Sequence, residues 1–112
     1  GNLSSLMEFD LNNNNLKTSI PSELGRLVNL TILKLSNNMF TGLIPEDLKN
    51  LNQLRMLHLQ GNRLEGNLTI KVTTEKYNES SFVADCGYPS IFERPLHCSN
   101  CSVCCNYLSE CQ

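Results

Sequence analysis

The segment Leu27–Leu48, LVNLTILKLSNNMFTGLIPEDL, decides the fold because related segments precede and follow it at a constant interval. LSSLMEFDLNNNNLKTSIPSEL begins at Leu3 and LNQLRMLHLQGNRLEGNLTIKV begins at Leu51, so both offsets are 24 residues. An internal repeat of this length is typical of a solenoid, in which each copy forms one structural unit. One copy cannot bury its apolar residues alone, but stacked copies share a continuous core.

Four apolar columns and one asparagine column recur in all three copies: Leu6, Leu30, Leu54; Phe9, Leu33, Leu57; Leu11, Leu35, Leu59; Leu16, Phe40, Leu64; and Asn14, Asn38, Asn62. The alternation of Leu33 and Leu35 around Lys34 predicts a half-buried strand with Lys34 exposed. Each copy should supply one strand of a parallel sheet, near residues 8–10, 32–34 and 56–58. The asparagine amides should bond backbone groups after each strand and form a ladder.

These residues resemble the leucine-rich repeat, and LSNNMFTGLIPEDLKNL resembles its plant-type form. The marks of that form are Gly42, Ile44 and Pro45 in the second copy and Ile20 and Pro21 in the first. The copies depart from it at Thr18, which replaces the glycine, and at Leu68 and Thr69, which replace Ile-Pro. The resemblance implies an α/β solenoid arc with a parallel concave sheet and short 3₁₀ or helical convex turns that begin at the proline. The cysteines of the tail predict that a disulfide-rich C-terminal cap completes this fold.

The repeat region covers residues 1–72, with copies at 3–26, 27–50 and 51–72. Residues 73–85 follow as a polar loop and a degenerate last strand, Phe82–Asp85, because Phe82 lies 25 residues after Leu57. Residues 86–112 hold all six cysteines and form the expected cap. At the other end, an uncapped apolar face predicts further repeats N-terminal to Gly1; that face comprises Leu3, Leu6, Phe9 and Leu11.

Composition excludes several function classes. The net charge of -2 and the scattered basic residues exclude an electrostatic footprint for nucleic acid. No apolar run is long enough to span a membrane, and no signal peptide is visible after Gly1. We expect no cofactor and no enzymatic activity. A hydrolase built from Ser36 and His58 is disfavoured, because Lys34 would stand between Asp10 and His58 and no glycine elbow surrounds Ser36.

The stretch HCSNCSVCC at His97–Cys105 is open to a zinc, a redox or a disulfide interpretation. The crowded spacing disfavours zinc and leaves His97 as a surface residue. Five N-x-S/T sequons favour a secretory context, in which six cysteines predict three disulfides. We expect Cys86 to bond a cysteine of the C-terminal cluster and neighbouring Cys104 and Cys105 to have separate partners. The cysteines are Cys86, Cys98, Cys101, Cys104, Cys105 and Cys111, and the candidate glycosylation sites are Asn2, Asn29, Asn67, Asn78 and Asn100.

The tail from Phe82 to Cys111 also resembles the cysteine-rich tails of secreted or membrane-anchored leucine-rich-repeat proteins of diatoms. The shared elements are Ala-Asp-Cys at 84–86 and the crowded cysteines at 101–105. The resemblance implies a secreted or cell-surface protein.

Partners of leucine-rich repeats usually bind variable positions of the concave sheet. The candidate binding residues here are Met7, Glu8, Asp10, Asn12, Thr31, Ile32, Lys34, Ser36, Arg55, Met56, His58 and Gln60. A further column, Asn13, Asn37 and Gly61, runs beside them. Asp10, Lys34 and His58 should form a cross-strand charged row, which is either a solvated face or part of a binding surface. The sequence therefore predicts a protein- or peptide-recognition module, a structural wall or matrix glycoprotein as the alternative, and a metal-binding tail as a weaker one.

Overall fold

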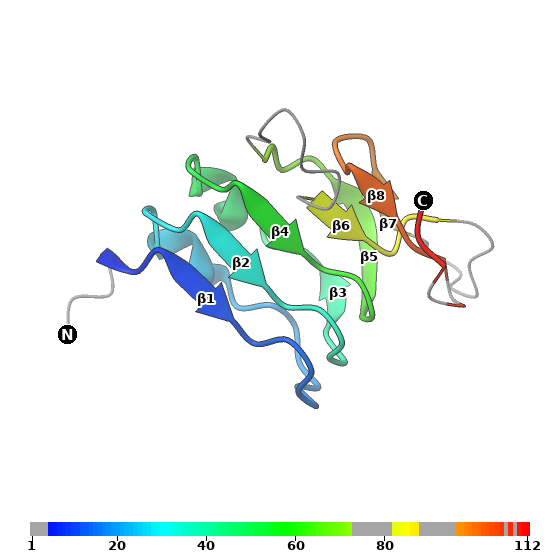
Figure 1. Cartoon of the computed structure of the whole chain (residues 1–112). Coiled ribbons are helices and arrows are strands. Elements are labelled where there is room, and N and C mark those ends of the chain that lie inside the picture. Colours follow the sequence, from blue (N-terminus) through cyan, green and yellow to red (C-terminus); the bar gives the residue numbers. More distant parts are fainter. Residues whose placement is uncertain (1–4, 73–81, 88–95, 107, 109) are drawn as a thin grey trace.

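The computed structural model of the chain describes residues 5–72, 82–87, 96–106, 108 and 110–112. Its main feature is a parallel sheet of five strands, ordered β1-β2-β4-β6-β8, which we call the long sheet (Figure 1). The strands are β1 (Glu8–Asp10), β2 (Ile32–Lys34), β4 (Met56–His58), β6 (Phe82–Ala84) and β8 (Val103–Cys104). The first three have the predicted bounds, and β6 confirms the degenerate last strand.

The register of the long sheet follows the repeat period. Phe9 pairs with Leu33, and Leu33 pairs with Leu57. Leu57 pairs with Phe82, so the register is kept although the spacing between these two residues is 25 instead of 24. These side chains point into the core, where Leu33, Leu57 and Phe82 are fully buried. A single continuous core therefore runs through the stacked coils, as expected for a repeat protein.

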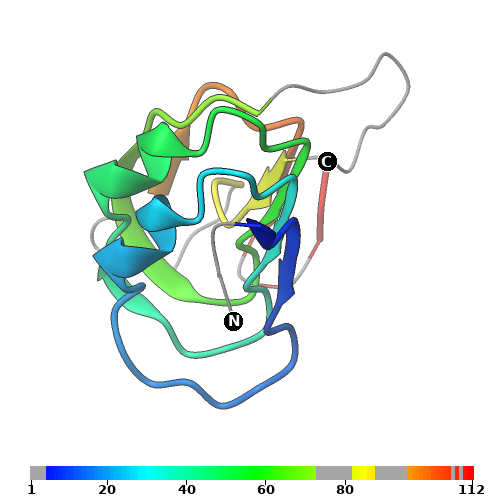
Figure 2. The ribbon, with the colours of Figure 1, turned by 90° about the vertical axis from the view of Figure 1, so that its left-hand side faces the viewer.

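Short 3₁₀ helices lie on the side of the solenoid opposite the long sheet (Figure 2). Helix η2 spans Ser22–Arg26 and helix η3 spans Glu46–Asn50. Pro21 and Pro45 immediately precede them at the N-cap position, as the resemblance implied. Proline suits the start of such a turn because its missing N–H would have no partner there.

A second parallel sheet was not predicted. It comprises β3 (Thr41–Leu43), β5 (Arg63–Leu68) and β7 (Leu96–Cys98), and we call it the lateral sheet. Thr41 pairs with Arg63, a separation of 22 residues, and Gly66 pairs with Leu96, a separation of 30. Neither spacing equals the 24-residue period, so the aligned columns could not reveal these pairs.

Three details of the repeat differ from the sequence-based expectation. Asn14 is exposed, because among the described residues no coil lies on its outer side, whereas Asn38 and Asn62 are buried. Leu16 is likewise exposed at the surface, while its equivalents in the next two coils are buried. Lys34 is half-buried rather than exposed, because strands on both sides flank its long stem.

The C-terminal region extends both sheets of the solenoid. It adds β7 to the lateral sheet and β8 to the long sheet. The end of the chain then covers the edge of β8, where Cys104 N–H donates to Gln112 O at 2.8 Å and Gln112 N–H donates to Cys104 O at 2.9 Å. The predicted polar loop at 73–81 lies outside the described residues, and the limits of the predicted domains stay predictions. Within the described ranges, no helix has the length and apolar character needed to cross a bilayer.

Candidate functional site

The outer face of the long sheet carries six of the predicted binding residues in two rows. Glu8, Ile32 and Met56 lie side by side in register. The second row, parallel to the first, holds Asp10, Lys34, His58, Val83 and Val103. Val83 is buried. Adjacent strands lie about 4.8 Å apart, so the exposed and half-buried side chains of each row lie within reach of one ligand.

The two rows differ in chemistry. Ile32 and Met56 are half-buried and form an apolar centre next to exposed Glu8. Met7, which directly precedes β1, is 59% exposed and extends the apolar surface. Arg55 is exposed just before β4. The face therefore combines apolar side chains with carboxylates and cations, which suits a ligand of mixed character.

Several predicted binding residues are engaged within the protein. Asn12 Oδ1 accepts hydrogen bonds from Ser36 N–H at 2.8 Å and Ser36 Oγ–H at 2.7 Å. Ser36 is 2% exposed, so we leave it out of the proposed surface. The Thr31 hydroxyl donates to Met7 O at 3.0 Å. The Oε1 atom of Gln60 is buried and has no hydrogen-bond partner among the described residues. These groups shape the coils more than they offer contacts to a ligand.

The column Asn13, Asn37 and Gly61 is explained by backbone conformation. All three residues have positive φ, at 62°, 57° and 75°. Asparagine and glycine are the residues that tolerate this left-handed region. Asn37 Nδ2–H also donates to Asn13 Oδ1 at 3.0 Å. The residue types in this column therefore follow from the turn after each strand and need no ligand to account for them.

The charged row has the predicted register, but Asp10 has a different contact from the one expected. Asp10 Oδ1 accepts the backbone N–H of Asn12 at 2.9 Å, which ties the carboxylate to the end of its own strand. Beyond His58 the row becomes apolar, since β6 places Val83 next and β8 places Val103 after it.

The asparagine column bonds the turns of neighbouring coils. Asn38 Nδ2–H donates to Leu11 O at 2.9 Å, and Asn62 Nδ2–H donates to Leu35 O at 2.9 Å. The amide N–H of each asparagine therefore bonds a backbone carbonyl of the preceding coil. The amide oxygen also bonds the preceding coil: Phe40 N–H donates to Asn62 Oδ1 at 3.1 Å. Buried backbone groups are satisfied in this way across the stack.

Asp85 performs a structural role that the sequence analysis missed. Asn13 N–H and Asn37 N–H donate to the carbonyls of Ser36 and Gln60 in the next coil. Gly61 is the third residue of this column, and its N–H donates instead to the side-chain Oδ1 of Asp85 at 3.0 Å. Asn62 N–H donates to Asp85 Oδ2 at 3.0 Å. Burial raises the pKa of Asp85, while the two backbone hydrogen bonds oppose the shift. The only sequence signal was an acidic residue in the column of Asn12, Ser36 and Gln60.

All six cysteines form disulfides: Cys86–Cys104, Cys98–Cys101 and Cys105–Cys111. Cys86 bonds a cysteine of the C-terminal cluster, and the neighbours Cys104 and Cys105 have separate partners, so both expectations are confirmed. The Cys86–Cys104 bond joins the end of β6 to β8 and thus links the solenoid to its C-terminal region.

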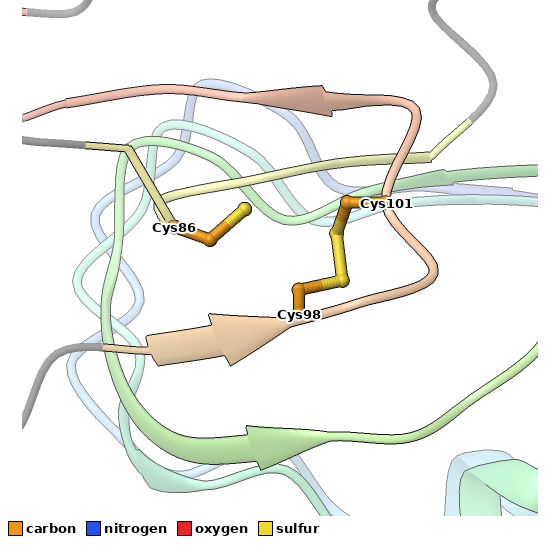
Figure 3. Close-up of side chains that lie close together, drawn as sticks. All are labelled: Cys86, Cys98 and Cys101. Atoms are coloured by element: carbon orange, nitrogen blue, oxygen red, sulfur yellow. A yellow bond between two sulfur atoms is a disulfide. The ribbon is translucent and has the colours of Figure 1, made fainter.

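Three sulfur atoms gather at the centre of this region. The Sγ atoms of Cys86, Cys98 and Cys101 all lie within 4.8 Å of one another, and Figure 3 shows Cys86 pointing toward the Cys98–Cys101 pair. A metal needs thiolate sulfur, whereas each of these atoms is held in a disulfide. The cluster packs against the hydrophobic core, and its arrangement fits a cross-linked cap. His97 is exposed on β7.

The described sequons lie outside the strands of the long sheet. Asn29 is half-buried before β2, Asn67 is exposed on β5 of the lateral sheet, and Asn100 is exposed after β7. Asn2 and Asn78 lie outside the described residues. None of these three asparagines lies on a strand of the long sheet.

Stacked parallel coils with L-x-L strands, an asparagine ladder and convex 3₁₀ turns define a leucine-rich-repeat solenoid. The sequence model of the family described as "Leucine rich repeat" matches residues 4–64, which is more than half of the chain. The chain therefore belongs to the leucine-rich-repeat family. A comparison with curated protein sequences gives no match.

Solved structures of plant receptors resemble this chain. The leucine-rich-repeat ectodomain of the receptor kinase SOBIR1 from Arabidopsis thaliana is 39% identical, with a TM-score of 0.57, over 60% of this chain and 36% of that one. The structure of PEPR1–AtPEP1 is 46% identical, with a TM-score of 0.56, over 58% of this chain and 9% of that one.

The ectodomain of GASSHO1/SCHENGEN3 from Arabidopsis thaliana, solved with CASPARIAN STRIP INTEGRITY FACTOR 2, is 37% identical, with a TM-score of 0.56, over 58% of this chain and 8% of that one. This chain therefore spans about a third of the SOBIR1 ectodomain and under a tenth of the other two chains.

Proposed function

We propose that the chain is an extracellular protein- or peptide-recognition module of a receptor-like or inhibitor-like leucine-rich-repeat protein. Its ligand binds the outer face of the long sheet. The observation that carries this proposal is the row of Glu8, Ile32 and Met56, where two half-buried apolar side chains lie in register beside a carboxylate. A rigid sheet holds these groups at fixed spacing, so little ordering is needed on binding.

The solved relatives support the same function. Two of them were solved as complexes: PEPR1 with AtPEP1, and GASSHO1/SCHENGEN3 with CASPARIAN STRIP INTEGRITY FACTOR 2. The extracellular location is supported by the three disulfides, since such bonds persist in oxidising compartments. The resemblance of the tail to diatom surface proteins agrees with that location.

Selection of peptides tests this function. The folded, oxidised chain would be immobilised, and a random library of displayed peptides of about 12 residues would be selected against it. An extended peptide of that length, about 40 Å, is more than long enough to cross the five strands. We expect enriched peptides that lose binding to an Ile32→Glu and Met56→Glu double variant, because buried charge would replace the apolar centre.

A matched control comes from the lateral side of the solenoid. Leu43 is also an exposed apolar residue, but it lies on β3. Peptides selected on the parent should bind Leu43→Ser unchanged. Peptides that respond to Leu43→Ser and not to the double variant would contradict the assignment of the face.

The alternative function is a structural wall or matrix glycoprotein in which the solenoid is a spacer. Glycan mapping separates the two functions, because sugars that crowd the long sheet would block recognition. Asn29, Asn67 and Asn100 all lie off the strands of that sheet, which favours recognition.

A further inference from the structure

A surface groove of about 210 Å³ lies between the lateral sheet and η3. Its most prominent wall residue is Leu43, which is 66% exposed and is therefore an unusually open large apolar side chain for this molecule. The other lining residues come from the turn before η3, from η3 itself, and from β5 and the segment that follows it; they include Pro45, Glu46, Lys49, Asn67 and Thr69.

An N-x-T sequon forms part of this groove. Asn67 and Thr69, the first and last residues of the sequon, both line it, and Asn67 is exposed. The remaining described sequons are engaged differently. Asn100 Nδ2–H donates to Ile70 O at 3.3 Å inside the turn closed by Cys98–Cys101. The sequon of Asn29 has its Thr31 hydroxyl bonded to a backbone carbonyl.

We propose that Asn67 carries an N-linked glycan and that its first sugar occupies this groove. In the attachment step, Asn67 Nδ2 forms a bond to the anomeric carbon of a lipid-diphosphate-linked oligosaccharide. The bond from that carbon to the diphosphate oxygen breaks, the lipid diphosphate leaves, and Nδ2 loses one proton. The modification rests on the extracellular location proposed above, because sequons are glycosylated in the secretory pathway.

The groove offers both kinds of contact that a pyranose ring needs. Leu43 and Pro45 provide apolar surface for the C–H face of the sugar, and covering them removes exposed apolar area from water. Glu46 and Lys49 stand at the rim, joined by an exposed ion pair of 3.7 Å, and can exchange that contact for sugar hydroxyls. An exposed ion pair of this kind is weak, so breaking it to make hydrogen bonds to the sugar costs little free energy.

The position of the groove also bears on recognition. Asn67 lies on β5 of the lateral sheet, and the predicted ligand face belongs to the long sheet. A glycan at Asn67 would shield Leu43 and the apolar groove from unspecific association, while the long sheet stays accessible.

Mass spectrometry of the chain secreted from a eukaryotic host tests occupancy. We expect a glycopeptide that contains Asn67, and its loss in Asn67→Gln. Asn78→Gln is the matched control and should leave the Asn67 glycopeptide unchanged. Secreted protein with glycans at other sequons and none at Asn67 would overturn this proposal alone. Absence of all glycans together with free thiols would overturn the extracellular location as well.

Thermal unfolding tests whether the first sugar occupies the groove. An endoglycosidase that leaves a single N-acetylglucosamine would be applied, and the product compared with Asn67→Gln from the same host. We expect Asn67→Gln to unfold about 2–4 °C lower, the shift that a weak contact gives in a chain of this size. In a Leu43→Ser background that difference should vanish, because the apolar wall is lost.

The Leu43 side chain is mostly exposed, so its replacement should leave the core intact and the comparison interpretable. The proposed position of the sugar would be wrong if Asn67→Gln lowered the melting temperature equally in the parent and in Leu43→Ser. It would also be wrong if Asn67→Gln caused no change in the parent. Asn78→Gln again serves as the control for a glycan at another position.

Discussion

Asp85 shows how one side chain accommodates a change in the repeat period. The spacing from Gln60 to Asp85 is 25 residues instead of 24, and the carboxylate replaces a backbone carbonyl as the acceptor for Gly61 N–H. A carboxylate accepts two such bonds at once, which a carbonyl of the next coil would not do for both Gly61 and Asn62. The last regular turn is therefore completed by a side chain.

The raised pKa of Asp85 predicts a pH dependence of stability. The folded-state pKa lies above the ordinary 3.8, so the folded state binds the proton more tightly than the unfolded state does. The contribution of Asp85 to the free energy of unfolding should therefore fall as pH rises from below 3.8 through the raised value. Asp85→Asn removes this term, and its lost acceptor adds a cost that does not vary with pH.

Urea unfolding of the parent and of Asp85→Asn, followed across the acidic range to neutral pH, measures this contribution. The parent's stability relative to the variant should decline with rising pH over that window. A difference that is constant, or that grows with pH, would contradict a raised pKa.

Gly61 and Gly42 give a matched pair at the residue scale. Both have positive φ, at 75° and 81°, so alanine should cost about 1–2 kcal/mol at either position. A Cβ at Gly61 would also clash with Asn37 Oδ1, whereas one at Gly42 meets open space. Chemical denaturation should therefore show a larger loss for Gly61→Ala, by about 1–3 kcal/mol for the overpacking. Equal losses would show that Asn37 moves aside freely.

At the scale of elements, β2 holds the stack together because it lies between two neighbouring coils. Leu33 has no exposed surface and pairs with Phe9 on one side and Leu57 on the other. Leu33→Ala should cost about 2–5 kcal/mol of unfolding free energy, from lost burial and the cavity left behind. The neighbouring Lys34→Ala, on the opposite face of the strand, should change stability by under about 1 kcal/mol. Similar losses for the two variants would mean that the register is wrong.

The Cys86–Cys104 bond fixes the last two strands of the long sheet. It closes a sequence separation of 18 residues, while Cys98–Cys101 closes one of 3. Replacing both Cys86 and Cys104 with serine should lower the free energy of unfolding by about 2–5 kcal/mol. Removing the Cys98–Cys101 bond, which closes a shorter loop, should lower it less. Hydrogen exchange should show faster opening of Ser102 N–H and Cys105 N–H, which bond β6, before Leu35 N–H near β4 responds. Uniform acceleration along the chain would contradict nearest-neighbour coupling between coils.

At the scale of the whole molecule, the two ends of the long sheet differ. The edge of β8 is covered by the backbone of Gln112. At the opposite end, β1 is the outermost of the described strands, and Leu6, Phe9 and Leu11 are only partly buried against the core. An uncovered strand edge above an apolar surface is prone to pairing with other chains.

This asymmetry predicts self-association through the β1 end. Sedimentation velocity should show larger species as the concentration of the chain rises. Fusion of one designed coil with a polar outer face before residue 5 should abolish the association and raise the melting temperature. A monodisperse chain that gains nothing from the added coil would contradict the importance of this end.

The sequence by itself determined the coil architecture. Equivalent residues recur every 24 positions, and equivalent positions of stacked repeats form the same secondary structure. The first and last residues of β1, β2 and β4 could therefore be predicted. The irregular β6 was also predictable, because Phe82 repeats the apolar column with an offset of one. The binding face follows from the same periodicity, although whether a ligand uses it stays a proposal.

Only the tertiary structure decided the features that do not follow the period. The lateral sheet pairs residues 22 and 30 positions apart, and its short β3 contains Gly42 at positive φ, so no alternation marks it in the sequence. Six cysteines allow 15 pairings, and the choice depends on which sulfur atoms the coils bring together. Asp85 and the groove at Asn67 likewise arise from contacts between coils, which a list of columns does not contain.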